Sequence, residues 1–255
     1  MKRVRTTDAL PFELAGFGPH VALLHDSLLS ARGLRPLADL MSVDHEVVTL
    51  HLPGHGRASS VVADTDRTAD LAANTAGAAI WFGHGWGARI ALKLALDRPE
   101  LVRCLVLVAP EMGFSGAARV ERQRRDEQLA ARLVANGPDE ALPTWLDRYD
   151  NEVRHAQFEA SVQDNGRYGM ATSLCVAGLG SNEPLASRLG DVDAPTLVIA
   201  GGNDREAMAR ADIVHSLIGI NSTSVSVPGA AGAPHLTLPE ETTACVRGWA
   251  LAAIR

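Results

Sequence analysis

Short apolar runs separated by helical patterns dominate the sequence. A continuous apolar run at residues 20–25 is typical of a central parallel strand that is covered on both faces. Further strand-like runs follow at residues 46–51, 80–82, 102–108, 195–200 and 223–227. Helical patterns lie between them, and a final helix is expected from Pro239 towards Ile254. This alternation predicts an α/β fold with a mostly parallel central sheet, right-handed crossovers and flanking helices.

The strand rhythm stops between residues 113 and 189. This stretch is charged, helix-prone and rich in arginine, notably at residues 120–126. It predicts a helical cap insertion over the sheet, so we expect a core built from residues 1–112 and 190–255 and a cap built from residues 113–189. At the start of the chain, residues 2–16 alternate in a way that indicates an antiparallel hairpin.

The apolar run at residue 80 leads into a turn with a glycine at every second position, 83–87, and then into a helix. This is the layout of a strand-turn-helix nucleophile elbow, in which a serine stands between two glycines on a strained backbone. Here that position is Gly85, so a covalent acyl intermediate at this residue is chemically impossible. Two interpretations stay open: chemistry without a covalent intermediate, or loss of activity with relief of about 1–3 kcal/mol of strain.

Polar residues follow the predicted strands at the edge of the sheet where ligands of parallel sheets bind. They include Asp26, Asp204 and His235. We expect His235 to act as a general base with Asp204 fixing its tautomer, although a loop histidine without a role is the alternative. The backbone N–H groups of Ser27 and Trp86 take the usual oxyanion-hole positions. An inward Asp26 carboxylate would oppose negative charge there; pairing with His235 or facing a neighbouring loop are the other possibilities.

The order of elbow, Asp204 and His235 along the chain matches the α/β-hydrolase arrangement. Together with Leu24-His25 and residues 52–56, 202–204 and 229–235, it makes the whole chain resemble the α/β-hydrolase-fold superfamily. We expect His25, His51 and His55 to be structural, bonding to nearby backbone.

A narrower resemblance is carried by residues 87–89, residues 121–126 and Trp145, which are similar to the menaquinone-pathway 2-succinyl-6-hydroxy-2,4-cyclohexadiene-1-carboxylate synthase family. That family eliminates pyruvate from a multiply carboxylated cyclohexene, with a triad serine thought to abstract a proton. The resemblance implies that Arg89 and Arg122 bind carboxylates and that Trp145 lines the pocket.

The departures from that family fall on the site itself. Gly85 replaces the serine, His84 stands at the substrate-binding position of a tyrosine, and Asp26 stands where a glycine is usual. We therefore expect a lyase-like enzyme that acts on a small carboxylated substrate by proton abstraction and elimination without a serine nucleophile. The alternatives are a catalytically silent ligand-binding protein with a degenerate triad, and a hydrolase in which a histidine activates water.

Composition and charge restrict the class of protein and the kinds of partner. The chain has 255 residues, a net charge of −6, and 46% apolar and 21% charged residues, as in an ordinary globular protein. The charge argues against a nucleic-acid partner, and the absence of a long apolar run or a signal-peptide core argues against a membrane protein and for a cytoplasmic one. The spacing of Cys104, Cys175 and Cys245 shows no metal or disulfide pattern, so we expect free thiols and no cofactor. The sequence leaves the oligomeric state undetermined.

Overall fold

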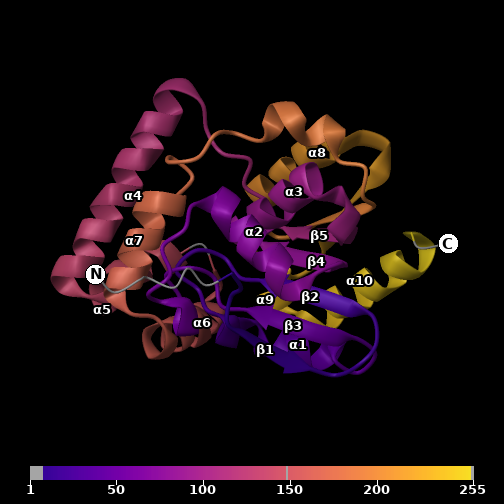
Figure 1. Ribbon diagram of the computed structural model, residues 1–255, viewed down its shortest axis with the longest axis horizontal. Coiled ribbons are helices and arrows are strands. Elements are labelled where there is room, and N and C mark those ends of the chain that lie inside the picture. Colours follow the sequence, from indigo (N-terminus) through magenta and orange to yellow (C-terminus); the bar gives the residue numbers. More distant parts are fainter. Residues whose placement is uncertain (1–7, 148, 254–255) are drawn as a thin grey trace.

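The computed structural model of the protein describes residues 8–147 and 149–253, and its centre is a single seven-stranded sheet (Figure 1). The strand order is β1-β3-β2-β4-β5-β6-β7. Every neighbouring pair is parallel except β1 and β3. The strands are β1 (Phe12–Ala15), β2 (His20–Leu24), β3 (Glu46–Leu50), β4 (Ala79–His84), β5 (Val102–Val108), β6 (Thr196–Gly201) and β7 (Ser222–Val227). The mostly parallel α/β sheet expected from the sequence is thus confirmed.

Helices cover both faces of this sheet. They are α1 (Arg35–Met41), α2 (Thr65–Ala76), α3 (Trp86–Asp97), α8 (Arg205–Ile218), α9 (Pro234–Thr237) and α10 (Pro239–Ala253). Successive side chains of a strand point to opposite faces. In β2, Ala22 and Leu24 accordingly join a core cluster with α2, α3 and α8, whereas Val21 and Leu23 join a cluster with α1 and α10. Burial on both faces explains why the strands are continuous apolar runs.

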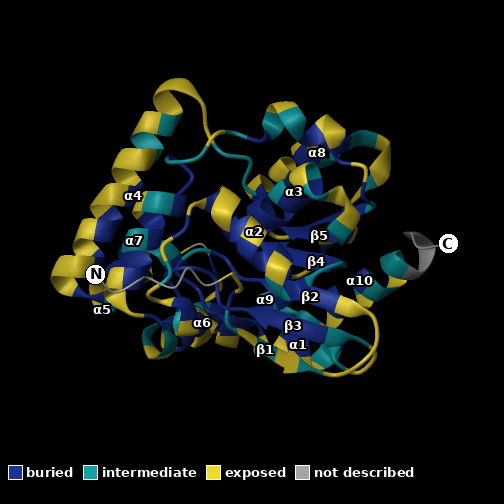
Figure 2. Cartoon of the chain, viewed as in Figure 1, coloured by how far each residue is buried: buried dark blue, intermediate teal, exposed yellow. Residues whose placement is uncertain are grey.

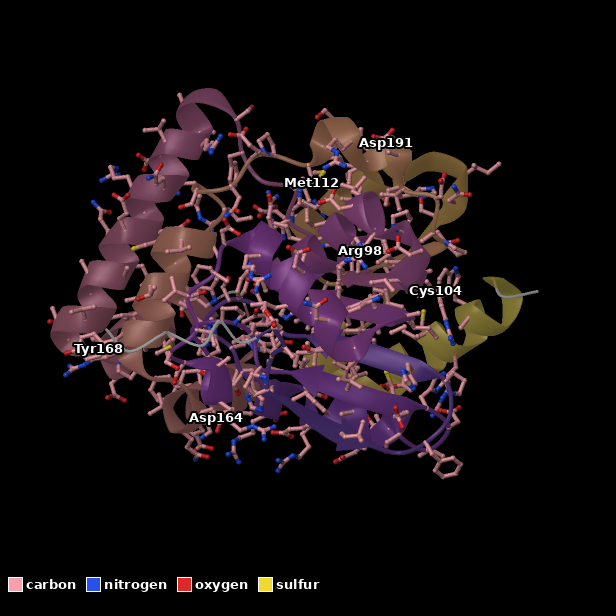
Figure 3. The ribbon with its side chains drawn as sticks, viewed as in Figure 1. Arg98, Cys104, Met112, Asp164, Tyr168 and Asp191 are labelled. Carbon is pink, nitrogen blue, oxygen red and sulfur yellow. The ribbon has the colours of Figure 1, made fainter. Side chains whose placement is uncertain are left out.

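Residues between β5 and β6 form four helices at one end of the molecule. They are α4 (Gly116–Asn136), α5 (Pro138–Leu146), α6 (Asn151–Asp164) and α7 (Arg167–Ala177). In Figure 1, α4 and α7 pack side by side, far from the end of α10. The four helices enclose a core of their own, and Leu28 and Leu29 from the loop after β2 are buried within it. The outer face of α4 is exposed (Figure 2), and its side chains project away from the rest of the molecule (Figure 3).

Short 3-10 turns complete the described elements, at Ala31–Leu34, Gly56–Ala58, Pro99–Leu101, Ala186–Asp191 and Gly219–Asn221. Within the described part of the chain, no helix is both long enough and apolar enough to cross a membrane.

The antiparallel hairpin expected at residues 2–16 stays a prediction. Residues 2–7 lie outside the described residues, and β1 pairs with β3 in an antiparallel ladder from Phe12 and Leu50 to Ala15 and Val47. β1 therefore extends the edge of the sheet through a distant partner, which a local alternating pattern does not specify.

Candidate active site

The elbow between β4 and α3 is a sharp turn that only glycine fits comfortably. Gly85 has φ +54° and ψ −111°, in the left-handed region that strains other residues. Its N–H donates to the carbonyl of Val108 at 3.0 Å, and its carbonyl accepts from the N–H of Arg89 at 3.1 Å. The turn thus keeps nucleophile-elbow geometry although the residue at its tip has no side chain.

The space beside Gly85 is filled by the carboxylate of Asp26. A Cβ atom built on Gly85 would lie 2.7 Å from Oδ2 of Asp26 and closer still to its Cγ and Oδ1. Real Cβ atoms essentially never approach a neighbour within 3.0 Å. Asp26 and a side chain at position 85 are therefore mutually exclusive in this arrangement.

The same carboxylate accepts both N–H groups of the expected oxyanion hole. The N–H groups of Ser27 and Trp86 each donate to Oδ1 of Asp26 at 2.8 Å. Asp26 is 2% exposed, and both donors favour the ionised carboxylate. Of the orientations that the sequence left open, the structure shows the inward one, in which the protein's own anion occupies the hole.

Two buried histidines hold the loop that carries Asp26. Because Nε2 of His55 accepts the N–H of Leu28 at 3.0 Å, its proton is on Nδ1, which donates to the carbonyl of Pro53 at 2.9 Å. His25 donates from Nδ1 to the carbonyl of Asp26 at 2.8 Å. These bonds fix Leu28 at a positive φ of 62°. The structural role expected for His25 and His55 is confirmed.

Burial keeps these imidazoles neutral. It lowers the pKa of His55 to about 4 and the pKa of His25 well below its usual value. Neutral rings are required here because each Nε2 accepts a backbone N–H.

His235 lies at the start of α9 and packs edge-on against His84, with 4.6 Å between the ring centroids. It is 1% exposed, and neither ring nitrogen has a hydrogen-bond partner among the described residues. Burial, with a contribution from His84, lowers its pKa well below the usual value. His235 is therefore a neutral imidazole at pH 7.

The hydrogen bond that we expected between Asp204 and His235 is not formed. Oδ1 of Asp204 instead accepts the N–H of Ala207 at 2.9 Å, which makes Asp204 the N-cap of α8. A capping carboxylate satisfies one of the orphan N–H groups of a helix and interacts well with its dipole. This local role competes with the distant imidazole and prevails in the structure.

A cavity of about 320 Å³, which we call the elbow cavity, opens above these residues. Asp26, Gly85 and Asp204 line it, as their positions after predicted strands suggested, and His84 at the end of β4 lines it too. Four other expected site residues are not among its lining residues: Ser27, Trp86, Arg89 and His235. Its other lining residues are Ala109, Glu111, Tyr149, Glu206, Arg210 and Gly232. Sequence analysis missed Tyr149, which comes from the α4–α7 segment; Ala109 carried a usable signal, since it directly follows β5.

Arg89 is buried one helical turn beyond Gly85. Its Nη2 donates to the carbonyl of Glu183, whereas Nε and Nη1 have no hydrogen-bond partner among the described residues. Burial lowers its pKa to about 10, so the guanidinium stays charged at neutral pH. Glu111, which lines the elbow cavity, offsets part of this shift. A buried cation with unmatched donors is suited to bind an anion.

Arg122 and Trp145 do not line the elbow cavity. They line a separate cavity of about 790 Å³ between α4 and α5. Nε of Arg122 donates to Oδ1 of the buried Asp126 at 2.8 Å, and its guanidinium lies 5.8 Å from the ring centre of Phe114 and 5.9 Å from that of Trp145. The structure thus separates Arg122 and Trp145 from His84, with which the sequence had grouped them, because Arg122 finds its carboxylate within its own helix.

Residues 15–244 match the model of the Alpha/beta hydrolase family. The chain belongs to this family. Among its alpha/beta hydrolase relatives is the putative 2-succinyl-6-hydroxy-2,4-cyclohexadiene-1-carboxylate synthase of Bacillus subtilis, 26% identical, with 92% of this chain and 93% of that protein covered. Another is the (E)-2-((N-methylformamido)methylene)succinate hydrolase of Acinetobacter baylyi, 23% identical, with 92% and 91% covered.

Solved structures share the alpha/beta hydrolase fold over nearly the whole chain. MenH from S. aureus superimposes with a TM-score of 0.84 at 21% identity, covering 98% of this chain and 100% of that one. A thermophilic esterase from Thermogutta terrifontis has a TM-score of 0.85 at 20% identity, with 96% and 93% covered. Both relatives known from sequence are named as enzymes, and both names denote carboxylated compounds.

Proposed function

We propose that this alpha/beta hydrolase is a lyase-type enzyme that removes a proton from a small carboxylated substrate and eliminates a leaving group without a covalent intermediate at the elbow. The observation that carries the proposal is the exchange at the elbow, where a fixed carboxylate takes the space of a nucleophilic side chain. This exchange removes the hydroxyl needed for acyl transfer and leaves acid–base chemistry in the elbow cavity.

The similarity to the Bacillus subtilis synthase supports the substrate class, and Arg89 supplies a physical reason for it. Nε and Nη1 of Arg89, which have no hydrogen-bond partner among the described residues, are buried one turn from the elbow. A substrate carboxylate that reached them would form charge-assisted bonds and satisfy a buried cation. We further propose that the α4–α7 segment acts as a cap, since it contributes Tyr149 to the wall of the elbow cavity.

The test is turnover of the multiply carboxylated cyclohexene from which the synthase family eliminates pyruvate, followed by a coupled assay for pyruvate. Arg89→Met should raise KM about tenfold or more, as loss of a charge-assisted bond implies. The matched control is Arg188→Met, because Arg188 pairs with Asp97 on the surface. An equal KM for both variants would show that Arg89 does not bind the substrate.

A second function, ligand binding without chemistry, is favoured by the occupied oxyanion hole, because Asp26 blocks that position for a substrate carbonyl. Calorimetry would then show binding of the same cyclohexene without release of pyruvate. The third candidate, hydrolysis by activated water, predicts turnover of (E)-2-((N-methylformamido)methylene)succinate, the compound named for the Acinetobacter baylyi relative.

A further inference from the structure

The carboxylate of Asp26 reproduces three properties of the missing nucleophile. It fills the space next to the α-carbon of residue 85, it lies within reach of the N–H of Trp86, and it lines the elbow cavity. Oδ1 is held by two backbone donors, and Oδ2 belongs to the same rigid group. A group reaching across from the loop after β2 thus stands where the elbow would otherwise place its own side chain.

A carboxylate in this position also accounts for the broken link between Asp204 and His235. A serine hydroxyl is a weak base until a histidine, oriented by an acid, withdraws its proton. A carboxylate is ionised without such help. Asp204 is therefore released to cap α8, and His235 can remain a neutral ring with no hydrogen-bond partner among the described residues.

His235 is poorly placed to take a substrate proton itself. Its ring packs edge-on against both Phe82 and His84, with centroid distances of 5.4 and 4.6 Å, and it is 1% exposed. His84 lines the elbow cavity, whereas His235 is not among the residues that line it. A direct proton transfer requires a donor and acceptor within hydrogen-bond reach.

We infer that Asp26 is the catalytic base of this site, in place of the elbow serine and of His235. The inference rests on the proposed function. Asp26 takes a proton from the substrate carbon, so a C–H bond breaks and an O–H bond forms. The electron pair of the C–H bond stays on the substrate carbon as a carbanion, which can take a proton back from Asp26 and so exchange it with solvent. In elimination this pair becomes the new C=C bond as the leaving group departs with its own bonding pair. The proton then passes from Asp26 to the leaving group, which restores the carboxylate without any further reactant.

The loop that carries Asp26 is built to keep its carboxylate in place. Its backbone carbonyl accepts from His25, and the following turn is fixed by His55 through the N–H of Leu28. A base held this rigidly meets the substrate in one geometry, which is the condition for efficient proton transfer.

Asp26→Asn tests the inference because the amide oxygen can still accept both N–H groups while the charge and basicity are lost. We expect kcat for elimination to fall about 10²–10⁴-fold, the usual contribution of a general base. His235→Ala is the comparison, with a loss of kcat below about tenfold. Urea unfolding of both variants shows whether each remains folded. Proton NMR in D₂O gives a second readout, since the wild-type protein should exchange the abstracted substrate proton for deuterium and Asp26→Asn should not.

The outcomes distinguish failure of the role inferred for Asp26 from failure of the proposed function. Elimination that survives in Asp26→Asn and is lost in His235→Ala overturns the role of Asp26 and leaves the proposed function standing. Exchange that depends on Asp26 without any elimination supports the base and overturns the lyase. Neither exchange nor elimination by the wild-type protein, with the cyclohexene bound, overturns both.

Discussion

Restoring a serine at the elbow should damage this protein. In Gly85→Ser, the new Cβ would stand within 3.0 Å of the Asp26 carboxylate, which would have to leave its two N–H donors. Loss of two bonds to a charged group costs about 1.5–3 kcal/mol each. The positive φ of 54° adds about 1–3 kcal/mol of strain. We expect the free energy of unfolding to fall by about 4 kcal/mol or more.

A double-mutant cycle isolates the contact. Asp26→Gly removes the same two hydrogen bonds and leaves room for the serine, so these bonds are lost only once in Asp26→Gly/Gly85→Ser. The double variant should therefore be more stable than the sum of the single effects by about 3 kcal/mol or more, the value of the two shared bonds. Urea unfolding at constant m measures each corner of the cycle.

Gly77→Ser is the matched control for strain. Gly77 has a φ of 63°, and a Cβ built on it meets nothing within 4 Å. It should lose only the strain of about 1–3 kcal/mol. If Gly85→Ser is no less stable than Gly77→Ser, and the cycle is additive within about 0.5 kcal/mol, the exclusion between Asp26 and a side chain at position 85 is refuted.

Two further predictions concern acid sensitivity and backbone strain. Burial lowers the pKa of His55 to about 4. The linked part of the free energy of unfolding is present above about pH 6.5 and is lost as the pH falls towards 4. It amounts to about 3 kcal/mol. His55→Gln should therefore cost less at pH 4.5 than at pH 7.5 in urea unfolding, and an equal cost would contradict this. Ala109→Gly should raise stability by about 1 kcal/mol, because Ala109 has a φ of 46°. Ala131→Gly, in the exposed face of α4, should instead lose about 1 kcal/mol, and a loss in both would argue against strain at Ala109.

The fold was predictable because its signals are local. Runs such as β2 and β5 are apolar on both faces, and helices such as α3, which packs against both, are close to them in sequence. Ligands of parallel sheets bind beyond the carboxyl ends of the strands, and this rule likewise predicted that Asp26, Gly85 and Asp204 would lie at one cavity. The pairing of β1 with β3 escaped prediction because both hairpin and distant pairings satisfy the same alternating pattern.

Side-chain partners in the site were less predictable because each depends on competition between distant groups. The inward turn of Asp26 requires the N–H of Trp86, which is 60 positions away. Asp204 could accept a hydrogen bond from the N-terminus of α8 or from His235. It accepts the bond from the helix, whose donor is nearer along the chain. Arg122 was expected at the substrate but binds Asp126 within α4. Sequence similarity predicted which types of residue occur around the site, but it predicted only some of their contacts.

Burial of Leu28 and Leu29 in the core of the α4–α7 segment makes that segment part of the support of Asp26. Any rearrangement of these helices pulls on the loop only a few bonds from the carboxylate. Chimeras that exchange this segment with another family member would consequently have a different alignment of the Asp26 carboxylate along with a different wall of the elbow cavity. Redesign of substrate specificity in this fold should therefore replace residues 26–29 together with helices α4–α7.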